Sequence, residues 1–113
     1  MGDAVRIAIA LLFVAGCFMR TAAADPHLLV LAASCAACHG TGGNSVGGTP
    51  VLAGLDPSHF VLQMQAFRSG ERASTVMHHH AKGLTESEIE QLAAYFSEQP
   101  RTAAAPLKPV GEQ

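Results

Sequence analysis

The sequence has 113 residues, with seven lysines and arginines against nine aspartates and glutamates, and a formal net charge of −2. This length allows one domain. The charge balance excludes the basic surface of a nucleic-acid-binding protein and the strong field of one sign that selects a charged partner.

Residues 1–24 have the pattern of a secretory signal peptide. Arg6 precedes the apolar run Ile7 to Met19, and Ala22-Ala23-Ala24 forms a small-residue cleavage site. The apolar run is too short to span a bilayer as a helix, although an uncleaved anchor is the alternative. We expect export, with cleavage after Ala24 and a mature chain that begins at Asp25.

Cys17 leaves a second alternative open for the N-terminus. Residues 14–17 read Val-Ala-Gly-Cys and resemble a lipobox, in which the cysteine carries a lipid. Lipidation of Cys17 would anchor the protein to the membrane. After cleavage at Ala24 only Cys35 and Cys38 remain. If both hold a cofactor, no disulfide can stabilise so small a domain, and we expect the chain without its cofactor to fold poorly.

Residues 27–37 predict the first helix. Several of its apolar positions are alanine, which lets another helix approach closely. Its end meets the most informative segment of the chain, so the helix should position whatever that segment binds. The apolar positions are Leu28, Leu29, Leu31, Ala32 and Ala36.

The segment Cys35-Ala36-Ala37-Cys38-His39 has the C-x-x-C-H spacing by which c-type haem is attached. Two thiols about one helical turn apart can face one edge of a porphyrin and add to its two vinyl groups. His39 then offers an imidazole to the iron from the proximal side. We therefore predict one covalent haem c, with thioethers at Cys35 and Cys38.

Three other interpretations of these cysteines are weaker. A thioredoxin-like motif expects a βαβ context, and no strand pattern precedes Cys35. A zinc site needs further ligands, one of which the run His78-His79-His80 could supply. A structural disulfide would leave His39 without a role.

Residues 40–48 include five glycines and have the composition of a loop that can bring backbone close to a flat ligand. A phosphate-binding loop is disfavoured, because no strand precedes it and no Lys-Ser/Thr pair follows. In the next segment, residues 49–55, we expect the Pro50 carbonyl to orient His39, since a ligating imidazole usually donates its second N–H to such a group. A packing loop with a rigid proline explains the segment equally well.

The second predicted helix begins at Asp56, a good N-cap, and Pro57, which suits the first helical position. It ends at Gly70 after about three turns. One face is apolar and should point to the core. That face carries Phe60, Val61, Met64 and Phe67.

Residues 69–83 are expected to be irregular. The third helix then begins with a capping box formed by Thr85 and Glu88 and stops before Pro100. We place the haem domain at residues 25–99, and expect a disordered tail over residues 100–113. The third helix has one apolar face, made by Ile89, Leu92, Ala93 and Phe96.

Iron in an electron-transfer haem usually has two protein ligands. Met64 has the helical spacing of a core residue. Met77 falls in the segment expected to be a loop, free to reach the opposite haem face, and we predict it as the second axial ligand. The run of histidines is then a solvated segment. The alternatives are Met64, an open site, or one of His59, His78, His79 and His80.

Residues 32–99 resemble the class I cytochromes c of the bacterial periplasm, and more narrowly the haem subunit of flavocytochrome c sulfide dehydrogenases and related small monohaem cytochromes. The matching segments are CAACHGTGGNSVGG, TPVLAGL, QMQAFRSGERASTVM and LTESEIEQLAAYF. One departure is His80, where a more apolar residue is expected. The resemblance implies an all-α class I cytochrome c fold, with three main helices around one haem. It also implies the same site residues: Cys35, Cys38, His39, Met77 and the Pro50 carbonyl.

The chemistry and the resemblance lead to the same expectation about function. An iron with both axial positions filled does not readily bind substrate, so the domain should carry single electrons and not catalyse a reaction alone. The resemblance implies a periplasmic subunit that accepts electrons from a sulfide-oxidising, FAD-containing flavoprotein and passes them to a small acceptor cytochrome or another redox protein. The alternatives are a freely diffusing shuttle between respiratory or photosynthetic complexes, and a haem sensor or peroxidase with an open distal site.

Overall fold

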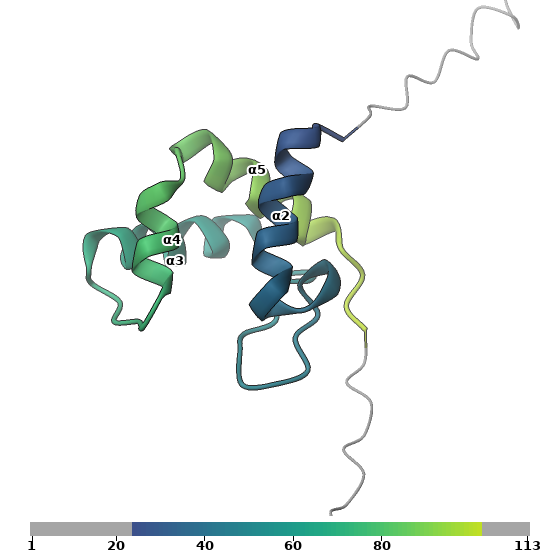
Figure 1. Ribbon diagram of the computed structural model, residues 1–113, viewed down its shortest axis with the longest axis horizontal. Coiled ribbons are helices and arrows are strands. Elements are labelled where there is room, and N and C mark those ends of the chain that lie inside the picture. The colour runs from purple at the N-terminus through teal and green to yellow at the C-terminus, as the bar shows by residue number, and fades with distance from the viewer. Residues whose placement is uncertain (1–23, 103–113) are drawn as a thin grey trace, which may run out of the picture.

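The computed structural model of the chain describes residues 24–102. Within them the elements are α2 (Pro26–His39), the short 3-10 helix η1 (Thr41–Gly43), α3 (Pro57–Ser69), α4 (Met77–Gly83) and α5 (Glu86–Glu98) (Figure 1). No strand occurs in this range, so the predicted all-α class is confirmed. Helix α3 packs against α4 and α5, and α2 packs against η1 and α5.

The two ends of the chain lie largely outside the described residues. The predictions of a signal peptide over residues 1–24 and of a lipid on Cys17 concern the first of them. No helix within residues 24–102 is long and apolar enough to cross a bilayer.

Two of the helices start in the same way. The Asp25 side chain accepts a hydrogen bond from the backbone N–H of His27 at 2.9 Å, and Asp56 accepts one from His59 at 2.9 Å. Each aspartate is followed by a proline at the first helical position, which suits that position because it lacks an N–H. The predicted start of α3 is confirmed, and α2 is longer at both ends than the predicted residues 27–37.

The capping box of α5 is also present. The Thr85 hydroxyl accepts from the Glu88 backbone N–H at 3.2 Å, and the Glu88 carboxylate accepts from the Thr85 N–H at 2.7 Å. Beyond α5 the chain stays in contact with the domain, because Arg101 Nε donates to the Ala53 carbonyl at 3.1 Å. Arg101, which the sequence assigned to the tail, therefore contacts the domain. Residues 103–113 of the predicted tail lie outside the described range.

The prediction that residues 69–83 are irregular is wrong for their second half, which forms α4. Met77 is therefore the first residue of a short helix and does not lie in a loop. The Ser74 hydroxyl accepts from the His78 backbone N–H at 3.0 Å, and Ala81 is fully buried. The described part of the fold therefore has four α-helices where the sequence predicted three. The sequence pattern missed α4 because seven residues are too few to show helical periodicity.

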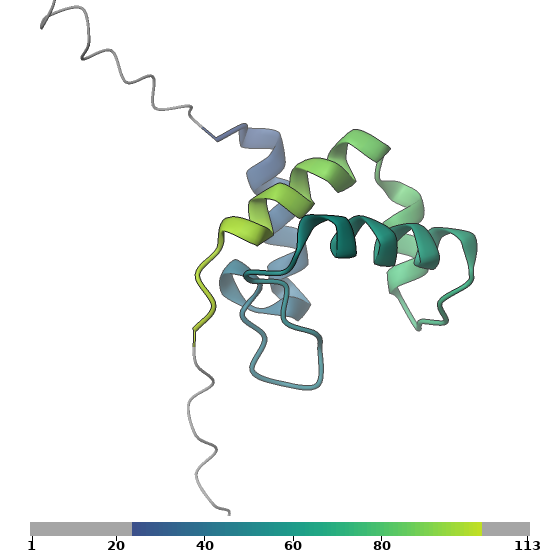
Figure 2. The same cartoon turned by 180° about the vertical axis from the view of Figure 1, so that it is seen from behind.

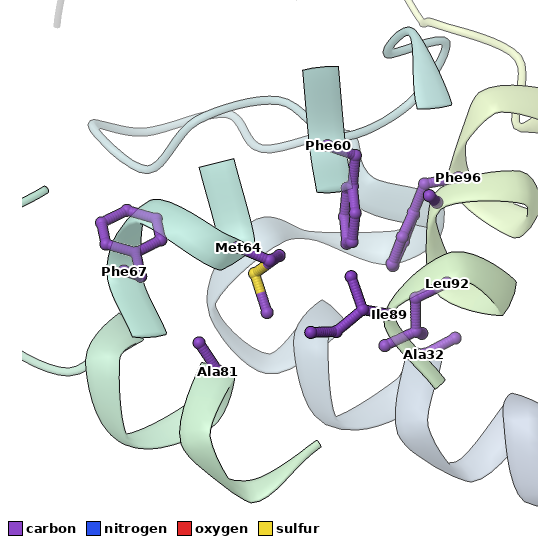
Figure 3. Close-up of a cluster of buried hydrophobic side chains, with 9 residues drawn as sticks. Ala32, Phe60, Met64, Phe67, Ala81, Ile89, Leu92 and Phe96 are labelled. Carbon is purple, nitrogen blue, oxygen red and sulfur yellow. The ribbon is translucent and has the colours of Figure 1, made fainter. Parts of the chain in front are cut away.

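The buried side chains form one cluster to which all four α-helices contribute (Figure 3). Within it Phe60 and Phe96 stack, with ring centroids 6.0 Å apart. Met64 is 6% exposed and lies inside the cluster, as its spacing predicted. The members are Ala32, Phe60, Met64, Phe67, Ala81, Ile89, Leu92, Ala93 and Phe96.

Two loops flank α3. One, residues 44–56, precedes the helix, and the other, residues 70–76, follows it. Both lie on the same side of α3, one near each of its ends, in the two opposite views of the molecule (Figures 1 and 2). The end of α2 lies near the first loop, and the start of α4 comes directly after the second.

Candidate haem site

The C-x-x-C-H segment forms the last turn of α2. Cys35 is partly buried and packs against the core cluster, whereas Cys38 is exposed, and both are free thiols. Burial raises the pKa of the Cys35 thiol above its ordinary value.

His39 is buried, and its ring is held in one orientation by the following loop. Its Nδ1 lies 2.7 Å from the Pro50 carbonyl oxygen, so Nδ1–H donates to that carbonyl. A neutral imidazole that carries its proton on Nδ1 presents the lone pair of Nε2, which is the tautomer a metal ligand needs. The contact expected between His39 and Pro50 is thus present.

Gly43 explains how the loop brings Pro50 back to His39. Its carbonyl accepts hydrogen bonds from the N–H groups of Leu52 at 2.8 Å and Ala53 at 3.2 Å, which closes the loop. Its φ of +77° belongs to the left-handed region. A Cβ at this position would lie 2.8 Å from Leu52 Cβ and 2.9 Å from Phe96 Cδ1, so only glycine fits.

Met77 is half-buried at the start of α4 and packs against the same core cluster as Cys35. The three histidines after it belong to α4, with His78 half-buried and His79 and His80 exposed. His78 and His79 have their ring centroids 3.9 Å apart. Within residues 24–102 no three His, Cys, Asp or Glu side chains converge as a metal site, so the histidines and the two cysteines do not form the cluster that the zinc interpretation needs.

Asn44 supports the same loop, and sequence reasoning missed it. Its carboxamide donates to the Pro100 carbonyl at 3.0 Å and accepts from the Thr102 N–H at 2.8 Å. One side chain thus fastens the glycine-rich loop to the segment after α5. The only signal was an asparagine among glycines, which is ordinary in a loop.

The residues present fit a covalent haem c. Two free thiols stand at the required spacing beside an imidazole whose Nδ1 is already committed to a carbonyl. Residues 27–99 match the family Cytochrome c. The chain belongs to the cytochrome c family. It therefore carries one covalent haem c, which supplies a one-electron couple, and the class I cytochrome c fold predicted from the sequence is confirmed.

Three relatives show which cytochromes c this one is similar to. It is 46% identical over 67 residues to the cytochrome subunit of sulfide dehydrogenase from Chlorobaculum tepidum, covering 59% of this chain and 61% of the relative. It is 42% identical over 93 residues to the thiosulfate dehydrogenase electron acceptor of Thiomonas intermedia, covering 80% of this chain and 37% of the relative. It is 44% identical over 72 residues to cytochrome c4 of Thiocapsa roseopersicina, covering 63% of this chain and 37% of the relative. This cytochrome c thus matches 37% to 61% of the length of these relatives.

Electron transfer is the function of this cytochrome c. Its own residues provide the attachment thiols, an oriented imidazole and a half-buried thioether on a shared apolar core. In haem proteins, the type of axial ligand, the hydrogen bonds to the ligands and burial set the potential of the iron.

Proposed function

We propose that this cytochrome c accepts electrons, one at a time, from a flavin-containing protein that oxidises sulfide, and passes them to a small acceptor cytochrome or another redox protein. The observation that carries this proposal is the 46% identity over 67 residues to a cytochrome subunit of sulfide dehydrogenase. A stable complex with the flavoprotein follows from the same proposal.

Within the site, Cys35 and Cys38 form the thioethers, His39 is the proximal ligand and Met77 is the distal ligand. The bond between His39 and the Pro50 carbonyl supports the proximal assignment, because it leaves Nε2 for the iron. The distal assignment is supported by position: Met77 begins α4, whereas the other candidate, Met64, is enclosed in the core. With both axial positions filled, the iron exchanges electrons and does not bind a substrate.

Replacement of Met77 by alanine tests the distal ligand. The variant should become high-spin, and its reduced form should bind carbon monoxide readily. Met64→Leu is the matched control, because it removes the other sulfur and nearly conserves volume, and it should leave the spectrum unchanged. A Met77→Ala protein with the parental spectrum would refute the assignment and revive the open-site or bis-histidine alternatives.

Affinity purification of the exported, haem-loaded protein from its own cells tests the partner. A co-purifying chain that contains flavin is expected, in a stoichiometric complex that survives gel filtration. Recovery of the cytochrome as a monomer without flavin would contradict the stable complex.

A freely diffusing electron carrier is the second candidate. It is favoured by the similarity to a thiosulfate dehydrogenase electron acceptor, which extends over 80% of this chain. If the protein is such a carrier, we expect it to be a monomer that a separate dehydrogenase reduces rapidly in solution, without forming a lasting complex.

Export to the periplasm, with cleavage after Ala24, completes the proposal. It is supported by the N-terminal pattern of a charged residue, an apolar run and an A-x-A site. The intact mass of the purified protein checks the cleavage site, the addition of one haem and any lipid on Cys17 in a single measurement. A mass that corresponds to a lipidated chain beginning at Cys17 would show that the protein is anchored to the membrane and is not free in the periplasm.

A further inference from the structure

We propose that Arg68 is a positioning residue for the distal ligand: from the end of α3, its guanidinium holds α4 in the place where Met77 can bind the haem iron. This inference rests on the proposed function, because it takes Met77 as the distal ligand. Arg68 is not itself a ligand of the iron. It acts through the backbone of the helix that Met77 begins.

The contacts of Arg68 all lead to one short stretch of chain. Its Nε–H donates to the Ala81 carbonyl at 3.0 Å, and one terminal nitrogen donates to the Leu84 carbonyl. The other terminal nitrogen pairs with the Glu86 carboxylate at the start of α5. A single planar group therefore joins the end of α3 to the end of α4 and to the start of α5.

Helix α4 depends on contacts of this kind, because it cannot be stable alone. It has seven residues, and isolated helices shorter than about 12 residues are marginal in water. The last carbonyls of any helix lack partners inside it, and Arg68 supplies one for Ala81 and another just beyond the helix at Leu84. Ala81 is also the only fully buried residue of α4, at the edge of the core cluster (Figure 3).

The fork shape of arginine matters more here than its charge. The side chain of Glu86 is 58% exposed, and exposed ion pairs contribute little. The two carbonyl bonds are different, because they need two donors held in one plane at the end of a long side chain. Lysine keeps the charge but has a point-like ammonium, which cannot reproduce that geometry.

The haem-loaded protein carries the experiment, with the variants Arg68→Ala, Arg68→Lys and Glu86→Gln. Lys82→Ala is the matched control, since it removes a positive charge from an exposed position on α4 itself. Met77→Ala is measured beside them as the reference for loss of the ligand. The readouts are the charge-transfer band of methionine-ligated ferric haem, the affinity of the reduced protein for carbon monoxide, and amide hydrogen exchange over residues 77–84 compared with residues 86–98.

In Arg68→Ala we expect exchange over residues 77–84 to accelerate about tenfold or more, and the affinity for carbon monoxide to rise by a similar factor, because hydrogen bonds from a charged donor are lost. Exchange in α5 should change little. The exchange rates and the carbon monoxide affinity of Arg68→Lys should be closer to those of Arg68→Ala than to those of the parent. The lysine variant also provides the test if the alanine variant does not fold. Glu86→Gln and Lys82→Ala should match the parent.

Two results would overturn the inference while the ligand assignment stands. One is parental carbon monoxide affinity in Arg68→Ala and Arg68→Lys when Met77→Ala binds it readily. The other is exchange that accelerates equally in α4 and α5, which would make Arg68 a general stabilising residue. An unchanged Met77→Ala protein would instead refute the distal assignment in the proposed function, and this inference would fall with it.

Discussion

Gly43 shows how one residue shapes the loop that holds the His39 ring. Its backbone accepts two hydrogen bonds from the segment that follows Pro50, and its missing side chain leaves room for Leu52 and Phe96. The Pro50 carbonyl reaches His39 only because the loop folds back at this point. The orientation of the His39 ring thus depends on a residue four positions further along the chain.

Gly43→Ala should therefore destabilise the protein by about 2–5 kcal/mol, since it combines a left-handed backbone with close contacts to packed atoms. Denaturant unfolding of the haem protein, followed by haem absorbance, measures the change. Gly48→Ala is the control, because a Cβ there meets no atom within 4 Å and the backbone is not left-handed. Equal stability of the two variants would contradict this account of the loop.

Helices α2 and α5 are joined at their N-terminal ends by a bond between side chains. The Nε2 of His27 and the carboxylate of Glu88 are 2.7 Å apart, and the same carboxylate closes the capping box of α5. The hydrogen bond from His27, followed by that from the Thr85 backbone, lowers the pKa of Glu88 below its usual range. One acidic side chain thus serves both the start of α5 and its contact with α2.

The lowered pKa predicts how stability depends on pH. The unfolded chain binds a proton at Glu88 more readily than the folded one. The contribution of ionised Glu88 to the free energy of unfolding is therefore complete above the ordinary glutamate pKa. It is lost as pH falls through the lower pKa of the folded state. Glu88→Gln should therefore flatten the acid side of the curve of unfolding free energy against pH. Glu90→Gln, with the same charge change at an exposed position of α5, should keep the parental slope. Parallel curves for Glu88→Gln and the parent would count against the contact with His27.

The core is small for a domain of this size. Three of the nine residues in the buried cluster are alanines, and the largest fully buried side chains are Phe96, Ile89 and Leu92. Small domains bury a low fraction of their surface, and natural ones usually add a cross-link or a cofactor. In this cytochrome c no disulfide joins Cys35 and Cys38, so the covalent haem is the element that can make up the deficit.

Removal of the haem should therefore cost this protein most of its cooperative folding. The double variant Cys35→Ala, Cys38→Ala, purified without haem, should show reduced helical circular dichroism and a broad, weakly cooperative denaturant transition. Residues 77–83 should lose amide protection first, because α4 is the shortest of the described α-helices and depends on its neighbours. A sharp transition at the midpoint of the haem protein would show that the polypeptide core is sufficient by itself.

The features that the sequence predicted correctly are those that depend on neighbouring residues. The C-x-x-C-H spacing, the Asp56-Pro57 start of α3 and the capping box at Thr85 each act within a few positions, so their chemistry can be read without a fold. The start of α2 at Asp25-Pro26 follows the same rule as α3 and could have been found by it.

Other features needed the tertiary structure, because they join residues that are distant in sequence. Helix α4 forms through burial of Ala81 and the hydrogen bonds of Arg68, neither of which leaves a periodic pattern. From the residues alone, a Pro50 carbonyl that orients His39 and a packing loop with a rigid proline explain residues 49–55 equally well. The loop geometry shows the hydrogen bond between His39 and the Pro50 carbonyl. The sequence by itself determined the cofactor and the helices that carry their own start signals. Only the packed fold decided how the loops and the short helix are held around them, since loop closure and long-range hydrogen bonds depend on where distant backbone groups meet.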